Sequence, residues 1–151
     1  DNSLRFRSTL AGSDLMTLQS GGNLGIGTTS PGHKLEVNGS FAATTKSFDI
    51  EHPTKEGMRL HHGSLEGPEH GVYHRGVGSS RVVDLPDYWT GLVDEDSITV
   101  QLTPKGQFQS LYVSKIEGNR VYVDSDHGEP LDFYFNVYGE RKDVDKLVVE
   151  Y

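Results

Sequence analysis

Short stretches in which apolar and polar residues alternate, separated by turns rich in glycine and proline, recur along nearly the whole chain. In the clearest of them, Ile98, Val100 and Leu102 fall on one face of an extended strand. Similar runs occupy Arg81–Leu85, Leu111–Ile116, Arg120–Asp124, Phe133–Gly139 and Leu147–Tyr151. No stretch keeps a helical period beyond one turn. This pattern predicts an all-β fold, with an antiparallel β-sandwich over residues 46–151.

The stretch Leu60–Gly76 is predicted to form a hairpin. Its two halves, Leu60–Glu66 and Val72–Val77, have strand character, and Gly67–Gly71 between them contains a proline. Proline fixes its own φ and glycine permits positive φ, so the chain can reverse direction there. We therefore expect the two halves to pair with each other across this connection.

Residues 1–45 have a different character, because large apolar side chains are sparse there. Leu24 and Ile26 alternate with glycines, and Leu35 and Val37 alternate again after a turn at Thr29–Gly32. So few apolar groups cannot offset a backbone ordering cost of roughly 1–2 kcal/mol per residue. We expect this region to become ordered when copies of the chain wrap around one another, with strand glycines letting backbones approach near an axis.

Composition excludes several classes of function. The chain has 22 acidic and 14 basic residues and a net charge of -8, which disfavours nucleic-acid binding. It has no cysteine, so disulfides, thiolate metal sites and a cysteine nucleophile are excluded. No apolar run approaches the roughly 20 residues that span a bilayer, so no membrane insertion is expected. Because the chain begins at Asp1 and not at methionine, we expect it to be part of a longer protein.

Two regions resemble a known family. Gly25–Gly39, GIGTTSPGHKLEVNG, resembles the GIGTTSP…KLxVxG motif of phage tail-fibre and related virion proteins, which also occurs in other large adhesive β-rich proteins. Lys46–Pro53 and Glu66–Gly76 resemble the KxFxIxHP…LxH…EGPExxVYxRG domain found towards the ends of many such fibres. Further matching stretches are Leu60–His61, Leu85–Trp89, Val100–Pro104 and Val137–Arg141. Together they span most of the sequence.

The resemblance implies a homotrimeric virion fibre, with an interwoven β stalk over residues 1–45 and a β-sandwich knob over residues 46–151. Such tips commonly contact the host surface, so the implied role is adsorption to a host glycan or protein receptor, alongside other virion tail proteins. No catalytic residue can be carried over, and we expect neither enzymatic activity nor a cofactor. The alternatives are a structural baseplate or capsid-decoration fibre without a receptor, and a bacterial surface adhesin.

Two segments are the candidate receptor-binding loops, Gly67–Gly71 and Asp87–Asp96. Sugar rings pack on aromatic side chains, and carboxylates and imidazoles hydrogen-bond hydroxyl groups. The candidate contacts are Glu69, His70, Tyr88, Trp89 and Asp94. Trp89 is expected more as a core or interface residue than as a contact. Truncating either loop is expected to preserve the trimer and abolish adsorption.

The histidines raise the question of a metal. His61, His70 and His74 could each be repeated around a threefold axis, and neutral imidazole is a common metal ligand. We favour the simpler expectation that no metal binds and that these side chains pack or face solvent. His61 and His62 are adjacent, so on a strand they face opposite sides.

The acidic clusters are the remaining candidates for chemistry. Glu66 and Glu69 could suggest a glycosidase pair, and Asp94–Asp96 or Asp124–Glu129 a calcium loop. The chain is too short for the long grooved β-helices that usually degrade polysaccharide, and the second acidic run lacks the full calcium-loop spacing. We expect solvated turns at all of these positions.

Overall fold

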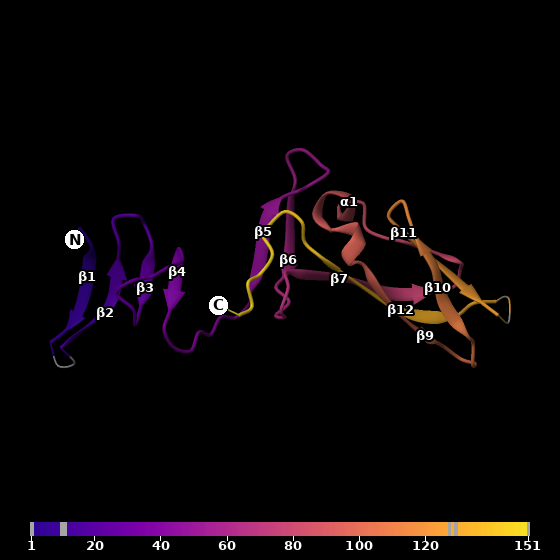
Figure 1. Ribbon diagram of the computed structural model, residues 1–151, viewed down its shortest axis with the longest axis horizontal. Helices are drawn as coiled ribbons and strands as arrows, with labels where there is room; N and C mark the ends of the chain where they lie inside the picture. Colours follow the sequence, from indigo (N-terminus) through magenta and orange to yellow (C-terminus); the bar gives the residue numbers. More distant parts are fainter. Residues whose placement is uncertain (1, 10–11, 127, 129, 151) are drawn as a thin grey trace. The chain divides into compact units, whose positions relative to one another are not determined.

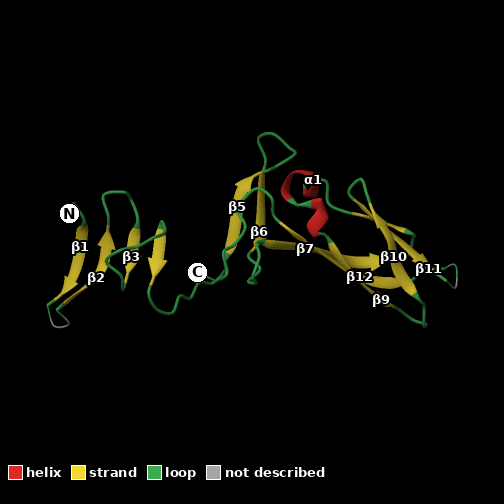
Figure 2. Cartoon of the chain, viewed as in Figure 1, coloured by secondary structure: helices red, strands yellow, loops and turns green. Residues whose placement is uncertain are grey.

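The computed structural model describes residues 2–9, 12–126, 128 and 130–150. The chain divides into two compact units, residues 1–45 (unit 1) and 46–151 (unit 2). Almost all of the regular structure is strand, most of it in antiparallel sheets (Figure 2). The predicted all-β class is therefore confirmed.

Unit 1 is a single four-stranded sheet with the strands in chain order (Figure 1). Its strands are β1 (Leu4–Ser8), β2 (Ser13–Leu18), β3 (Leu24–Ile26) and β4 (Leu35–Val37). The first three pair antiparallel, whereas β3 and β4 run parallel. The alternating stretches at Leu24 to Ile26 and Leu35 to Val37 form β3 and β4.

One face of this sheet is covered by the turn that follows β3. Gly25 is buried, and a Cβ there would collide with the carbonyl oxygen of Thr28 and lie 3.3 Å from Cδ of Pro31. Thr17, the β2 neighbour of Gly25, is also buried. Gly27 then adopts φ 71°, a left-handed conformation that glycine accepts at no steric cost. Gly25 therefore makes room for a turn of its own chain. The expectation that strand glycines let backbones of neighbouring copies approach near an axis stays a prediction.

Unit 2 contains eight strands and two short helices. They are β5 (Ser47–Glu51), β6 (Arg59–Gly63), β7 (Gly71–Gly78), β8 (Val82–Asp84), α1 (Trp89–Leu92), the 3-10 helix η1 (Glu95–Ser97), β9 (Thr99–Pro104), β10 (Leu111–Ile116), β11 (Arg120–Ser125) and β12 (Phe133–Glu140). They form a β7-β12-β9 sheet, a β10-β11-β8 sheet and a two-stranded β5-β6 sheet, all antiparallel.

The two three-stranded sheets, β6 and α1 contribute to one hydrophobic core. Its buried members are Leu60, Val72, Val83, Leu85, Trp89, Leu92, Val93, Val121, Val123, Leu131, Phe133, Phe135 and Val137. Ile98, Val100 and Leu102 pack against this core from one face of β9, as their alternation predicted. Glu117–Asn119 forms the hairpin turn that links β10 to β11, the two strands predicted at Leu111–Ile116 and Arg120–Asp124.

The hairpin predicted within Leu60–Gly76 is wrong. β6 pairs with β5, placing Leu60 opposite Ile50, while β7 pairs with β12. The physical reason lies in the glycines of β7. Gly76 and Gly78 sit directly opposite Phe135 and Phe133, and each aromatic ring covers the space that a side chain on the glycine would fill.

Two further expectations fail in unit 2. The segment predicted as a loop at Asp87–Asp96 contains α1 and η1, and α1 contributes Trp89 and Leu92 to the core. The predicted closing strand at Leu147–Tyr151 is not observed, because residues 145–150 have no strand assignment and Tyr151 lies outside the described residues.

Candidate functional site

The open face of the unit 1 sheet carries two apolar rows. The register aligns side chains across all four strands, because paired residues point to the same face. One row is Leu4, Leu18, Leu24 and Leu35, and the other is Phe6, Met16, Ile26 and Val37. We call these eight side chains the apolar face.

Among residues 2–9 and 12–45, no segment covers the apolar face, whose side chains are exposed or only partly buried. Leu4 is 59% exposed, Phe6 53% and Leu35 52%. Every buried Val, Leu, Phe or Trp side chain among the described residues belongs to unit 2. Exposed contiguous apolar surface of this kind marks a site of association.

The candidate loop Gly67–Gly71 is solvent-exposed as far as its final glycine. Glu69 and His70 are both exposed, so their side chains are available to a partner. The backbone is nevertheless fixed: the Gly71 amide donates to the Glu69 carbonyl at 2.9 Å, and the Arg141 amide donates to the His70 carbonyl at 2.9 Å. The loop is therefore held by Arg141, which directly follows β12, as well as by β7.

The structure places Trp89 in the core. Only 1% of its surface is exposed, which leaves no area for a receptor. Its ring packs near Gly139, where a Cβ would lie 3.5 Å from Cζ3 of Trp89 and 2.5 Å from Cγ1 of Val93. Trp89 is a packing residue, as the sequence favoured, and it is withdrawn as a receptor contact.

Tyr88 belongs to a ring cluster that joins α1 to the β5-β6 sheet. Its ring meets His62 edge-on, with centroids 5.4 Å apart, and His62 lies 5.1 Å from Phe48. The Arg141 guanidinium stacks over Phe48 at 4.1 Å. Burial raises the pKa of Tyr88, while burial and then the positive charge of Arg141 lower the pKa of His62. In this cluster Tyr88 and His62 pack α1 against the β5-β6 sheet.

Asp94 caps the 3-10 helix. Its carboxylate accepts a hydrogen bond from the Asp96 amide at 3.3 Å, and its own amide donates to the Glu140 carbonyl at 2.9 Å. Asp94 thereby anchors η1 to strand β12. With α1 in the core and η1 anchored, deleting Asp87–Asp96 would disrupt unit 2 itself. The predicted outcome of that deletion, an intact protein without adsorption, is withdrawn.

The histidines do not come together in one chain. His61 is exposed, and His74 is half-buried against Phe135 with centroids 5.4 Å apart, where burial lowers its pKa. Across the described residues, no three histidine or carboxylate side chains are placed to hold a metal ion. A site shared among three chains stays the less favoured alternative. In the second acidic run, Asp124 pairs with Arg81, whereas His127 and Glu129 lie outside the described residues.

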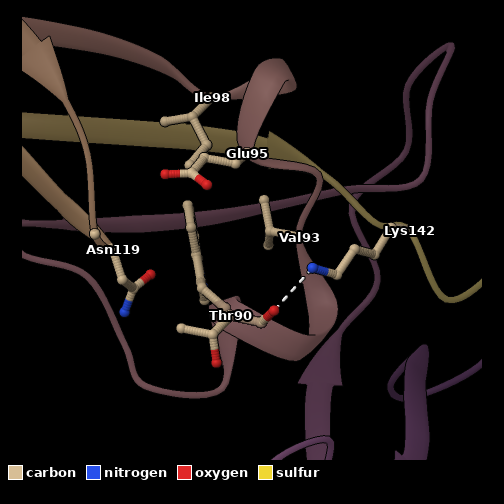
Figure 3. A pocket seen from close by; sticks show the side chains of 8 residues that line it. Thr90, Val93, Glu95, Ile98, Asn119 and Lys142 are labelled. Atoms are coloured by element: carbon tan, nitrogen blue, oxygen red, sulfur yellow. Dashed lines mark hydrogen bonds between the residues drawn. The ribbon is translucent and has the colours of Figure 1, made fainter.

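A pocket of about 380 Å³ opens beside α1, between Trp89 and the β10–β11 turn (Figure 3). Two of its polar side chains are engaged by backbone. The Lys142 ammonium donates to the Thr90 carbonyl at 2.8 Å, and the Asn119 amide donates to the Leu85 carbonyl at 3.0 Å. These contacts fix the helix and the turn in place.

Sequence reasoning missed the outer face of the β7-β12-β9 sheet. Tyr73 and Tyr138 are register partners there with ring centroids 6.1 Å apart, and Arg75 is paired with Asn136. At the far end of β12, Tyr134 is 49% exposed. Alternation along each strand indicates that these residues point away from the core. It does not show that they lie side by side, which follows only from the register of the three strands.

No family model, curated protein or solved structure matches this chain. No helix in the described ranges is long and apolar enough to cross a membrane.

Proposed function

We propose that this chain is the stalk and knob of a homotrimeric virion tail fibre that binds a host-surface receptor. The observation that carries the proposal is the apolar face of unit 1, which no other part of that unit covers. In unit 2 the same kinds of side chain are buried within the chain, so unit 2 needs no partner to complete its core.

Three copies of unit 1 would bury the apolar face if their sheets formed the sides of a triangular prism with the apolar rows inside. The strands already pair within one chain, so the copies meet through side chains. Burying one Leu, Ile or Phe side chain fully is worth about 1.5–3 kcal/mol. A dimer would also bury the face. The choice of three copies rests on the resemblance of Gly25–Gly39 to the fibre shaft motif.

The receptor-binding role is supported by the loop Gly67–Gly71. It is exposed, and a hydrogen bond from the Arg141 amide to the His70 carbonyl fixes its end. A trimer presents three such loops, so weak contacts multiply through avidity. Glu69 and His70 remain the proposed contacts in this loop.

Electron microscopy of virions labelled with an antibody against this chain tests its position. Label at the tip of a tail fibre is expected. Label on the capsid, or at an internal joint of the baseplate, would contradict receptor binding and favour the structural alternative. Label on uninfected bacteria would favour the adhesin alternative.

Cell binding tests the loop. We expect Glu69→Ala combined with His70→Ala to reduce adsorption of the labelled protein to host cells while the oligomer stays intact. The matched control is Lys55→Ala with Glu56→Ala, in the exposed turn between β5 and β6. Unchanged adsorption of the first variant would remove the loop from the binding site.

A further inference from the structure

The outer face of the β7-β12-β9 sheet is an ordered array of polar and aromatic side chains. Register pairing sets them in three cross-strand rows. The rows are Val77–Tyr134–Thr103, Arg75–Asn136–Gln101 and Tyr73–Tyr138–Thr99. We call this surface the tyrosine face. Its outer rows carry phenol rings, and its middle row carries a guanidinium and two amides.

Arg75, in the middle row, differs from every other arginine. Each of the others has a carboxylate within ion-pair distance: Arg5 and Arg7 with Asp14, Arg59 with Asp49, Arg81 with Asp124, Arg120 with Asp84 and Arg141 with Asp143. Among the described residues none forms an ion pair with Arg75, and its side chain is exposed. Although the chain has 22 acidic residues, this guanidinium is the one left without an ion pair among the described residues, and it lies on a surface that carries tyrosine rings.

We propose that the tyrosine face binds a glycan that carries carboxylate groups, such as a uronic-acid polysaccharide. Arg75 would hold the sugar carboxylate through its planar fork of N–H donors, a geometry that suits two parallel hydrogen bonds. This inference rests on the proposed receptor-binding function and names the chemical class of the receptor.

The rings on either side of Arg75 supply the stacking surface. Tyr73 is 48% exposed, and its partner Tyr138 extends the surface at a centroid distance of 6.1 Å. On the other side of the middle row lies Tyr134, also half-exposed. The C–H faces of pyranose rings pack on such aromatic surfaces, and the amides of Asn136 and Gln101 can both donate to and accept from sugar hydroxyls.

A pocket marks the position for one sugar unit. It measures about 380 Å³ and is lined in part by Arg75, Val77, Tyr134 and Asn136. This volume falls near the lower end of the roughly 300–1,000 Å³ typical of ligand pockets. A sugar residue in the pocket lies beside the Arg75 guanidinium and the Tyr134 ring together.

Local charge favours an acidic ligand despite the net charge of -8. None of the nine residues in the three rows is Asp or Glu. At the edge of this face, the Lys105 ammonium lies 5.5 Å from the centre of the Tyr134 ring. Its charge is balanced by the Asp132 carboxylate at 3.2 Å. Charges elsewhere on the surface are screened over about 8 Å at physiological salt. The uncompensated charge on this face is therefore the positive charge of Arg75.

Binding of the full chain to polygalacturonate, alginate and hyaluronate by isothermal titration calorimetry tests the inference. Each polymer is paired with the product of carboxyl reduction, which keeps the sugar chain and removes the charge. We expect at least one of the acidic polymers to bind. Its reduced partner should bind at least about tenfold more weakly, since hydrogen bonds to charged groups are worth about 1.5–3 kcal/mol. Added salt should weaken the binding. Equal binding of a polymer and its reduced form, or binding of none of the acidic polymers, would overturn the inference.

Arg75→Gln tests the assigned residue. We expect it to weaken binding by about tenfold or more, again from the lost charged hydrogen bonds. The matched control Arg59→Gln, on β6, should leave binding unchanged although it breaks the ion pair with Asp49. Equal binding by Arg75→Gln and the parent would remove Arg75 from the site. A change in the molecular mass of Arg75→Gln by light scattering would instead assign the tyrosine face to contacts between copies, and would also overturn the inference.

The two proposals can fail separately. If the parent and Arg75→Gln adsorb equally to host cells and neither binds an acidic polymer, the glycan inference falls and the receptor-binding function stands. If acidic polymers bind through Arg75 but virion labelling places the chain at an internal joint, the fibre-tip function falls and the glycan site stands.

Discussion

In unit 1 the apolar side chains of four strands line up on an open face, whereas in unit 2 comparable side chains meet between two sheets and helix α1. Both units use short alternating strands and tight glycine turns. They differ in whether a second layer exists within the chain to cover the apolar face. A single sheet without a second layer requires a partner. A chain with two sheets and a helix does not.

The largest expected effect is the loss of assembly when the apolar face receives a charge. Leu18→Asp lies in the first apolar row on β2, and threefold assembly would bury three unpaired carboxylates, each at a cost of several kcal/mol. We expect the mass measured by light scattering to fall from three chains to one, with the near-UV circular dichroism of unit 2 unchanged. The matched control is Leu15→Asp on the same strand, at a position 52% exposed and outside both rows. A trimeric Leu18→Asp would contradict the account of the apolar face.

Removal of the core tryptophan should act on the other unit. Trp89→Ala leaves a cavity at a position only 1% exposed, and we expect the free energy of unfolding of unit 2 to fall by about 3–5 kcal/mol. Assembly through unit 1 should persist, so the light-scattering mass stays at three chains wherever unit 2 is still soluble. Tyr112→Ala, at an aromatic position 52% exposed, serves as the control and should change stability little. If Trp89→Ala dissociates the oligomer, the two units are not independent.

A smaller effect is expected from the glycines beneath the phenylalanine rings. Gly78→Ala places a Cβ nearer than 3.0 Å to the Phe133 ring, and overpacking of this kind costs about 1–3 kcal/mol. Thermal unfolding should show a lower Tm for unit 2. Gly63→Ala, also on a strand, meets nothing within 4 Å and should leave the Tm near that of the parent. Equal Tm values for the two variants would show that the rings move aside freely.

The smallest effect is a dependence on pH that belongs to unit 2. Burial lowers the pKa of both His62 and His74 below the ordinary value of 6.5. Above pH 6.5 both histidines are mostly neutral in the folded and the unfolded chain, and their contribution to stability is fully present. As the pH falls below 6.5, the unfolded chain takes up protons that the folded chain resists, so stability declines. We expect the Tm to drop by a few degrees between about pH 7 and pH 5, and His74→Leu to flatten that curve. A Tm that rises over this interval would have the wrong sign.

Sequence alternation located most strands, because side-chain direction with period two is a local property. It placed β10 at Leu111–Ile116 with the observed ends and β12 at Phe133–Gly139 within one residue. It could not assign partners. β6 was expected to pair with β7, whereas the structure places the glycines of β7 opposite the phenylalanines of β12.

The candidate sites were harder to predict because they depend on strand pairing, which the local alternation does not reveal. Trp89 lies in a four-residue helix, too short to leave a helical period in the sequence. Tyr73 and Tyr138 lie far apart along the chain, and no local pattern indicates that they are neighbours on one face. The apolar face was anticipated only as a shortage of core in residues 1–45. Its two rows follow from a register that includes a parallel pair, β3 and β4.

The central claim is that copies of this chain cover the apolar face of unit 1. Size-exclusion chromatography coupled to light scattering, run on the full chain over a dilution series, tests it most directly. The account predicts the mass of three chains at every concentration. A monomer with a folded unit 1 would contradict it, because the apolar face would then be stable in water without a partner.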